Sequence, residues 1–352
     1  MTVTTEIADD STTADQALRH LRTGGSLLWR GDFHNGRQLL KAVDRRLSRR
    51  AGKRTVPRDA ASQFLRQRAD RAERADILGR ILVELGEGYT LDLRRAPDVR
   101  DACRHAYGAD RPDGPTTLPF TELQGVLGAW QWHQRGVWID ELGDHVYPDY
   151  GVFSPTRSEY IGLVARLAAR RADGLAGRDV LEIGTGTGVL AAVLARHGAT
   201  VTATDVSGRA VVCARRNLER WGCAAQVLEA DLWPGEHRAD VVVFNPPWLP
   251  GTPTSDLELG IYDADSGALR RFLAGLADHL TDGGEGWLVL SDLAEHLGLR
   301  SREQLEEWIA DGGLRVVGRE DTAPRHPKVR DADDPLHVAR SREVTSLWRL
   351  AV

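Results

Sequence analysis

The residues with the clearest chemical meaning follow a short apolar run, residues 241–244, that predicts a buried strand. They are an asparagine, two prolines and a tryptophan: Asn245, Pro246, Pro247 and Trp248. Two consecutive prolines cannot continue a strand or donate to it, so the backbone leaves the sheet rigidly and its carbonyls can face a cleft. The asparagine adds a side-chain acceptor and the tryptophan a flat face. This group suits a planar, poorly nucleophilic nitrogen, whose two N–H bonds it can accept while the nitrogen becomes pyramidal in a transition state.

Three alternating glycines, Gly184, Gly186 and Gly188, form a second informative stretch. They follow an apolar run at residues 180–183 and precede a helical pattern at 189–196, so they lie in a strand-to-helix turn. Because glycine has no β-carbon, a ligand can lie against the backbone N–H groups and the positive end of the helix. The spacing is E-x-G-x-G-x-G, which differs from the G-x-G-x-x-G dinucleotide fingerprint. We expect a cofactor site here; the alternative is a tight turn without a ligand.

Acidic residues mark the ends of the neighbouring predicted strands. Glu182 lies just before the glycine turn, and Asp205 follows Gly184 by 21 residues, a separation at which a carboxylate can accept both hydroxyls of a ribose. Asp231 ends the next strand and can accept from an adenine amino group, while Leu232 and the tryptophan after it offer apolar surface to the ring. Each acid also has an ordinary alternative as a capping or turn residue.

Together these motifs resemble class I S-adenosylmethionine-dependent methyltransferases, over residues 147–352. The tetrad is similar to the [ND]-P-P-[YFW] motif of enzymes that methylate planar nitrogen, although tyrosine or phenylalanine is more frequent at its last position. These enzymes include the HemK/PrmC protein-glutamine methyltransferases, the RsmC/RlmG "small-domain" ribosomal RNA guanine methyltransferases and amino-adenine DNA enzymes. The resemblance implies catalysis by the tetrad, S-adenosylmethionine as cofactor and no metal. It also implies cofactor contacts from Glu182, Gly184, Thr185, Gly186, Gly188, Asp205, Asp231 and Leu232.

The acceptor of the methyl group stays open at this stage. Residues 151–155 look like the RNA enzymes and, more loosely, like the glutamine enzymes, whereas residues 259–268 look more like the glutamine enzymes. We expect a nucleobase amine in RNA ahead of a protein glutamine amide, with a small amide or guanidine metabolite as a further option. A cofactor-binding module without activity is the alternative from another class, and the intact tetrad argues against it.

The elements that must position these residues alternate regularly after residue 147. Strands are predicted at 180–183, 200–205, 225–229, 241–244, 286–291, 314–319 and 344–350, and helices at 159–170, 189–196, 208–221, 266–280 and 301–311. Such alternation predicts an α/β fold in which helices cover both faces of a parallel sheet. No helix separates the last two strands, so the final strand must run antiparallel, which is similar to the seven-stranded methyltransferase sheet. Ligands bind beyond the carboxyl ends of such strands, where the residues named above lie.

The first part of the chain predicts a separate, mainly helical domain for substrate recognition, residues 15–146, after a mobile tail at residues 1–14. Its predicted elements are helices near 17–21, 36–47, 60–85 and 97–108, a strand at 26–29 and a loop at 111–119. Three tryptophans, Trp130, Trp132 and Trp138, are expected to pack between the domains, although tryptophan also stacks on nucleobases.

Positive charge is concentrated in this first part. Residues 37–80 contain 14 Lys or Arg residues and 5 acids, although the whole chain has a net charge of −5. Such a segment can follow a phosphate backbone, so we expect RNA to bind through the basic 37–80 region; solvated helix faces are an equally good explanation. A protein substrate is the other partner that we consider.

Composition sets further bounds. The chain has 352 residues, 41% hydrophobic and 28% charged, which allows two domains with a core each. It has no apolar run long enough for a membrane helix and no signal-peptide pattern, so we expect a cytoplasmic protein without membrane partners. The three cysteines have no metal-ligand spacing.

The connection between the last two predicted strands, residues 321–342, is far longer than a hairpin requires. It starts on the edge of the sheet that carries the glycine turn, and it contains two histidines and mixed charges. It is expected to form a rim or lid over the substrate, or else a solvated loop.

Overall fold

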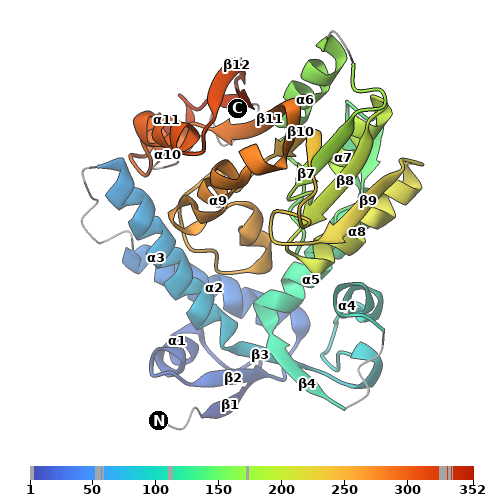
Figure 1. Ribbon diagram of the computed structural model, residues 1–352. Coiled ribbons are helices and arrows are strands. Elements are labelled where there is room, and N and C mark those ends of the chain that lie inside the picture. The colour runs from blue at the N-terminus through green and yellow to red at the C-terminus, as the bar shows by residue number, and fades with distance from the viewer. Residues whose placement is uncertain are drawn as a thin grey trace. The chain divides into compact units, whose positions relative to one another are not determined.

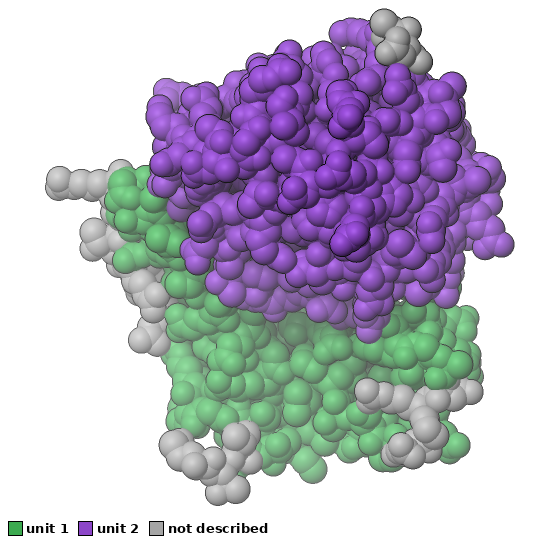
Figure 2. All heavy atoms as spheres, in the orientation of Figure 1, with its two compact units in different colours: residues 1–131 green, residues 132–352 purple. Residues whose placement is uncertain are grey.

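The computed structural model describes residues 4–51, 57, 59–109, 114–171, 174–324, 331, 334 and 336–352. The chain divides into two compact units, Met1–Gln131 and Trp132–Val352 (Figure 2). Among the described residues, no helix has the length and apolar character needed to cross a membrane.

The first unit contains a four-stranded sheet in the order β1-β2-β3-β4 (Figure 1). Its strands are β1 (Thr5–Ala8), β2 (Ser26–Trp29), β3 (Ile81–Leu85) and β4 (Thr116–Pro119). The first three are parallel, and β4 is antiparallel to β3. Its helices are α1 (Ala14–Arg22), α2 (Phe33–Ala51), α3 (Ala60–Gly79), α4 (Arg100–Tyr107) and the short η1 (Glu87–Tyr89). The boundary at Gln131 falls within a further helix, α5 (Phe120–Arg135). Among the described residues of this unit, more are helical than lie in strands, and of the four strands only β2 was predicted.

Three predictions for this unit are wrong. Residues 5–8 of the expected tail form β1, because pairing with β2 satisfies their backbone groups and buries Ala8. The expected helix at 60–85 ends at Gly79, and the chain continues as β3, in which Ile81, Val83 and Leu85 are fully buried on one face. Burial of every second residue is the pattern of a strand. The same apolar residues also fit a helical spacing, which is why a helix was predicted here. Part of the expected loop, Thr116–Pro119, is likewise a strand, because it pairs with β3.

The second unit is built on a seven-stranded sheet in the order β12-β13-β11-β10-β7-β8-β9. The strands are β7 (Asp179–Ile183), β8 (Thr200–Asp205), β9 (Ala225–Glu229), β10 (Ala239–Phe244), β11 (Leu280–Ser291), β12 (Arg315–Thr322) and β13 (Thr345–Ala351). β13 is antiparallel to both of its neighbours, β11 and β12, and the other pairs are parallel. The predicted α/β fold and antiparallel last strand are confirmed.

Helices cover both faces of this sheet (Figure 1). They are α6 (Glu159–Arg170), α7 (Val189–Arg196), α8 (Gly208–Arg220), α9 (Gly267–Gly275), α10 (Leu293–His296), α11 (Arg302–Asp311) and α12 (His337–Arg340), with the short η2 (Asp256–Gly260), η3 (Ala264–Ser266) and η4 (Ala277–His279). The side chains of β10 alternate between the faces. Val241 and Val243 pack with α6, α7 and α8, whereas Val242 and Phe244 pack with α9 and α11. The strand is therefore buried on both sides, which explains its continuous apolar run.

A small hairpin, β5 (Val137–Ile139) and β6 (Asp144–Val146), also belongs to the second unit. Ile139, Leu142 and Val146 are buried in the same core cluster as α6 and α7. The predicted boundary at residue 147 therefore lies too late in the chain. The apolar hairpin residues had no periodicity of their own to indicate which core they would join.

Replacing Ile139 by alanine should destabilise the second unit. The side chain is fully buried, so truncation leaves a cavity and should cost about 2–5 kcal/mol in the free energy of unfolding. Urea unfolding measures the cost. Ile7→Ala, at a side chain that is 75% exposed, is the matched control and should change little. Equal effects for the two variants would show that the hairpin is not part of this core.

Candidate active site at the carboxyl edge of the sheet

The glycine turn leaves β7 and is closed by backbone conformations that favour glycine. Gly186 and Gly188 have φ angles of 55° and 81°. A β-carbon on Gly188 would lie 3.2 Å from Ala214 of α8, so the close packing of the turn also requires glycine there. A β-carbon on Gly186 would meet nothing within 4 Å, which means that this side of the turn is open. The turn thus offers backbone to a ligand on one side and packs tightly on the other.

Asp205, at the end of β8, ties the neighbouring strand to this turn. One of its carboxylate oxygens accepts from the backbone N–H of Gly186 at 2.9 Å, and the other accepts from that of Ser207 at 2.9 Å. Burial raises the pKa of Asp205 above its ordinary value. Because each carboxylate oxygen has two lone pairs, the side chain can still accept from a ligand hydroxyl.

Glu182 lies inside the sheet directly beneath the turn. Its side chain is buried and accepts from the hydroxyl of Thr185 at 2.7 Å. Burial, with the nearby charge of Asp205 as a smaller contribution, raises the pKa of Glu182 to about 7. Glu182, Thr185 and Asp205 therefore form one polar group around the glycine turn.

Asp231 and Leu232 follow β9, the edge strand next to β8. Both oxygens of the exposed Asp231 carboxylate accept from Arg271 of α9, at 2.7 and 3.0 Å, and this partner lowers the pKa of Asp231. Leu232 is buried, and its carbonyl accepts from the hydroxyl of Thr204 at 2.8 Å. Trp233, beside it, stacks on His279 with ring centroids 4.0 Å apart. An ion pair to Arg271 thus already engages the carboxylate that was predicted to meet an adenine amine.

The tetrad extends from the end of β10, the strand beside β7. Registered pairing of Phe244 with Ile183 brings Asn245 next to the start of the glycine turn. The indole N–H of Trp248 donates to Oδ1 of Asn245 at 2.9 Å, and the guanidinium of Arg157 lies over the indole, 4.8 Å from its centroid. Sequence reasoning did not assign a role to Arg157, because no motif or spacing connects it with the tetrad.

Other predicted partners lie away from this edge. In the basic 37–80 region, Arg46, Arg74 and Arg80 form ion pairs with acids of the same unit. Lys53, Arg54, Arg58 and the side chain of Arg50 lie outside the described residues. The role of this region in RNA binding stays a prediction.

The long connection before β13 is described only in part. It begins with the end of β12 at Thr322 and contains the short helix α12, which was not predicted. Asp334 accepts from the backbone N–H of His337 through its carbonyl and pairs with Arg340 at 2.8 Å. Residues 325–330 lie outside the described residues, and the lid stays a prediction.

Comparison with known proteins identifies the part of the chain that carries these residues. Residues 145–311 match the family model described as methyltransferase small domain. The ribosomal RNA small subunit methyltransferase C of Alcanivorax borkumensis is 35% identical over 171 residues, which cover 47% of this chain and 49% of the relative. The release factor glutamine methyltransferase of Bordetella pertussis is 32% identical over 170 residues, which cover 44% of this chain and 60% of the relative. The predicted resemblance to both groups is confirmed, and the chain spans about half the length of these relatives.

Among solved structures, the ribosomal protein L11 methylase of Lactobacillus delbrueckii subsp. bulgaricus is similar over 59% of this chain and 85% of its own, with 18% identity and a TM-score of 0.40.

Replacing Glu182 by glutamine should change how stability depends on pH. The pKa of Glu182 is about 7 in the folded chain, against an ordinary value of 4.5. The folded chain therefore favours the protonated form of Glu182. The stability that this preference contributes is fully present below about pH 4.5 and is lost as the pH rises through about 7. Between pH 5 and pH 8, the free energy of unfolding of the natural chain should fall relative to that of Glu182→Gln, by up to about 3 kcal/mol.

Urea unfolding at both pH values tests this expectation. Glutamine keeps an oxygen that can accept from the hydroxyl of Thr185, so the substitution removes the titratable group but not this hydrogen bond. Glu306→Gln, at an exposed position on α11, is the control and should show no such pH dependence. A stability difference between Glu182→Gln and the natural chain that stays constant from pH 5 to pH 8 would contradict the raised pKa.

Proposed function

We propose that this chain transfers a methyl group from S-adenosylmethionine to a planar nitrogen, most favourably a nucleobase amine in RNA. The observation that carries the proposal is the position of the Asn245 tetrad, at the carboxyl end of β10 and directly beside the glycine turn that ends β7. Two strand ends that are neighbours in a parallel sheet bring an acceptor-rich group and a cofactor-type turn to the same edge.

The residues of the turn fit S-adenosylmethionine. The open side of Gly186 leaves room for a ligand against the backbone, and Asp205 keeps lone pairs for the ribose hydroxyls. Leu232 supplies apolar surface near an adenine ring; Asp231 would have to share its carboxylate with Arg271. When bound, the cofactor supplies a sulfonium methyl group that needs no further activation.

The tetrad would prepare the acceptor nitrogen. Oδ1 of Asn245 and the backbone carbonyl of Pro246 can accept the two N–H bonds of an amine or amide. Such bonds strengthen as the nitrogen becomes pyramidal and acquires positive charge, so they stabilise the transition state more than the flat ground state. Correct alignment of nitrogen, methyl and sulfur supplies much of the remaining acceleration.

The choice of acceptor rests on two observations. Relatives of similar identity are named for ribosomal RNA and for release-factor glutamine, so both classes stay in view. The excess of basic residues at 37–80 favours RNA, because a charged, phosphate-rich partner suits such a segment. In this proposal the first unit recognises the substrate, and a protein glutamine amide is the second candidate. A small amide or guanidine metabolite ranks third.

Replacing Asp205 by alanine should weaken S-adenosylmethionine binding by about 10- to 100-fold, because acceptors for charge-assisted hydrogen bonds are lost. Isothermal titration calorimetry measures the affinity, and thermal unfolding shows whether the variant is folded. Asp311→Ala, at an exposed carboxylate on α11, should bind as the natural chain does. Unchanged affinity in a folded Asp205→Ala would remove Asp205 from the cofactor site.

Replacing Asn245 by alanine should leave cofactor affinity within about twofold and lower turnover by about a hundredfold, the size expected for one transition-state hydrogen-bonding group. Radiolabelled S-adenosylmethionine incubated with RNA, protein and small-molecule fractions of a lysate gives both the rate and the class of acceptor. Label in protein alone would move the glutamine amide ahead of RNA. Full turnover in the variant would leave Asn245 as a structural turn residue.

A further inference from the structure

Arg157 lies between two buried carboxylates, just before α6. Its Nε donates to Oε1 of Glu159 at 2.9 Å, and its Nη2 donates to Oε1 of Glu343 at 2.9 Å. The side chains of Glu159 and Glu343 are only 2% and 1% exposed. The guanidinium has little freedom to move between these two acids. Any rotation would leave a buried carboxylate without its partner, which costs free energy.

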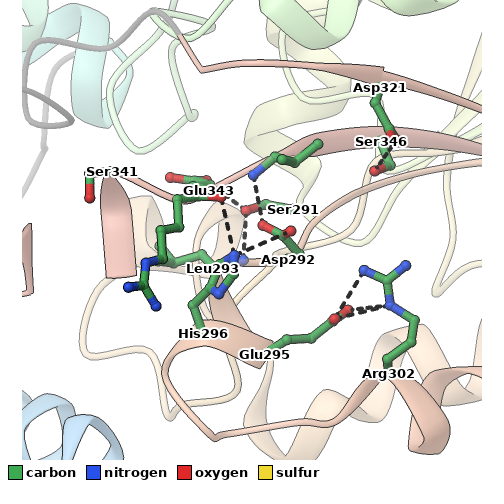
Figure 3. Close-up of polar contacts among 12 residues, drawn as sticks. Ser291, Asp292, Leu293, Glu295, His296, Arg302, Asp321, Ser341, Glu343 and Ser346 are labelled. Carbon is green, nitrogen blue, oxygen red and sulfur yellow. Dashed lines mark hydrogen bonds and ion pairs between the residues drawn. The ribbon is translucent and has the colours of Figure 1, made fainter. Parts of the chain in front are cut away.

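Glu343 is itself anchored at the end of β11. The hydroxyl of Ser291 donates to the same Oε1 at 2.6 Å, and the backbone N–H of Leu293 donates to that hydroxyl oxygen at 3.1 Å. The next residue, Val344, donates its backbone N–H to Asp292 at 2.7 Å. Figure 3 shows the Glu343 side chain directed at Ser291, with Asp292 beside it. Glu343 therefore holds Arg157 in a fixed position relative to the end of β11.

The free face of the guanidinium covers the indole of Trp248. The distance from Cζ to the ring centroid is 4.8 Å, which is within the range of a cation–π contact. The indole also packs against the two larger core clusters of the unit, one on each face of the sheet. Contact on these sides fixes the direction in which its N–H points.

That N–H donates to Oδ1 of Asn245 at 2.9 Å. An indole nitrogen is only a donor, so it selects the oxygen of the carboxamide and excludes the orientation with the NH₂ group in that place. The amide oxygen has a second lone pair, which stays available to another donor. Tyrosine or phenylalanine at this position has no indole N–H with which to do this.

We propose that Arg157 is a positioning residue. Held by Glu159 and Glu343, it sets the indole of Trp248, which in turn orients the carboxamide of Asn245 toward the acceptor nitrogen. This inference rests on the proposed function for its catalytic consequence, but the coupling of Arg157 to Asn245 is a property of the chain alone.

The test replaces the arginine by lysine. Arg157→Lys keeps the charge between the two acids and loses the planar group that covers the indole. Arg319→Lys is the matched control, because Arg319 lies over Trp348 at 4.7 Å, a similar contact that does not involve the tetrad. Two-dimensional ¹H–¹⁵N spectra report the indole N–H of Trp248, assigned by its loss in Trp248→Phe, and the side-chain amide of Asn245.

In Arg157→Lys we expect both signals to shift and the exchange of the indole proton with solvent to accelerate at least about tenfold. Turnover should fall about tenfold or more, with KM and cofactor affinity within about twofold, since misplacement of a reacting group affects the chemical step. Arg319→Lys should leave all of these unchanged. Unaltered Trp248 and Asn245 signals in a folded Arg157→Lys, or equal effects in the two variants, would overturn the inference.

Glu343→Gln provides a second variant if Arg157→Lys does not fold. It keeps the shape of the anchor and removes one of the two charges that hold Arg157, so the same signals should move in the same direction. If the natural chain methylates none of the fractions, the proposed function fails, and the spectra still decide whether Arg157 sets the Asn245 carboxamide.

Discussion

Parallel pairing of β7 with β8 on one side and β10 on the other is the constraint on which the rest of the second unit depends. Because the three strands run in the same direction and in register, the glycine turn, Asp205 and Asn245 all emerge at one edge. The hydrogen bond from Gly186 to Asp205 then joins two of these strand ends directly. A slip of one residue in either pair would turn these side chains to the other face of the sheet, so the register of the three strands decides whether the side chains meet.

The fold of the second unit could be predicted closely from the sequence, because most of its strands are apolar runs that alternate with amphipathic helices. The bounds of β8, β9 and α7 were predicted residue for residue, and the antiparallel β13 followed from the missing helix before it. The first unit was less predictable. Its strands contain four or five residues each, too few for a period to be distinguished from a helical one, and pairing between distant segments decides their structure.

In the candidate site, too, some features could be predicted from the sequence and others could not. The positions of Gly186, Asp205 and Asn245 could be predicted because each stands at the end of a recognisable strand. The engagement of Asp231 by Arg271 and the contact of Arg157 with Trp248 could not, since each joins segments that are far apart in the chain and depends on side-chain directions. Motifs identify which residues reach an edge, and only the packed structure shows which of them already have partners.

The insertion of β13 between β11 and β12 has a consequence for biosynthesis. This strand is made after both of its neighbours, yet it lies between them in the sheet, so β12 has no strand to pair with until β13 arrives. Glu343 directly precedes it and reaches its place beside Ser291 at the same late moment. A nascent or shortened chain that ends before residue 343 can already contain the glycine turn and the tetrad, yet it lacks the anchor of Arg157.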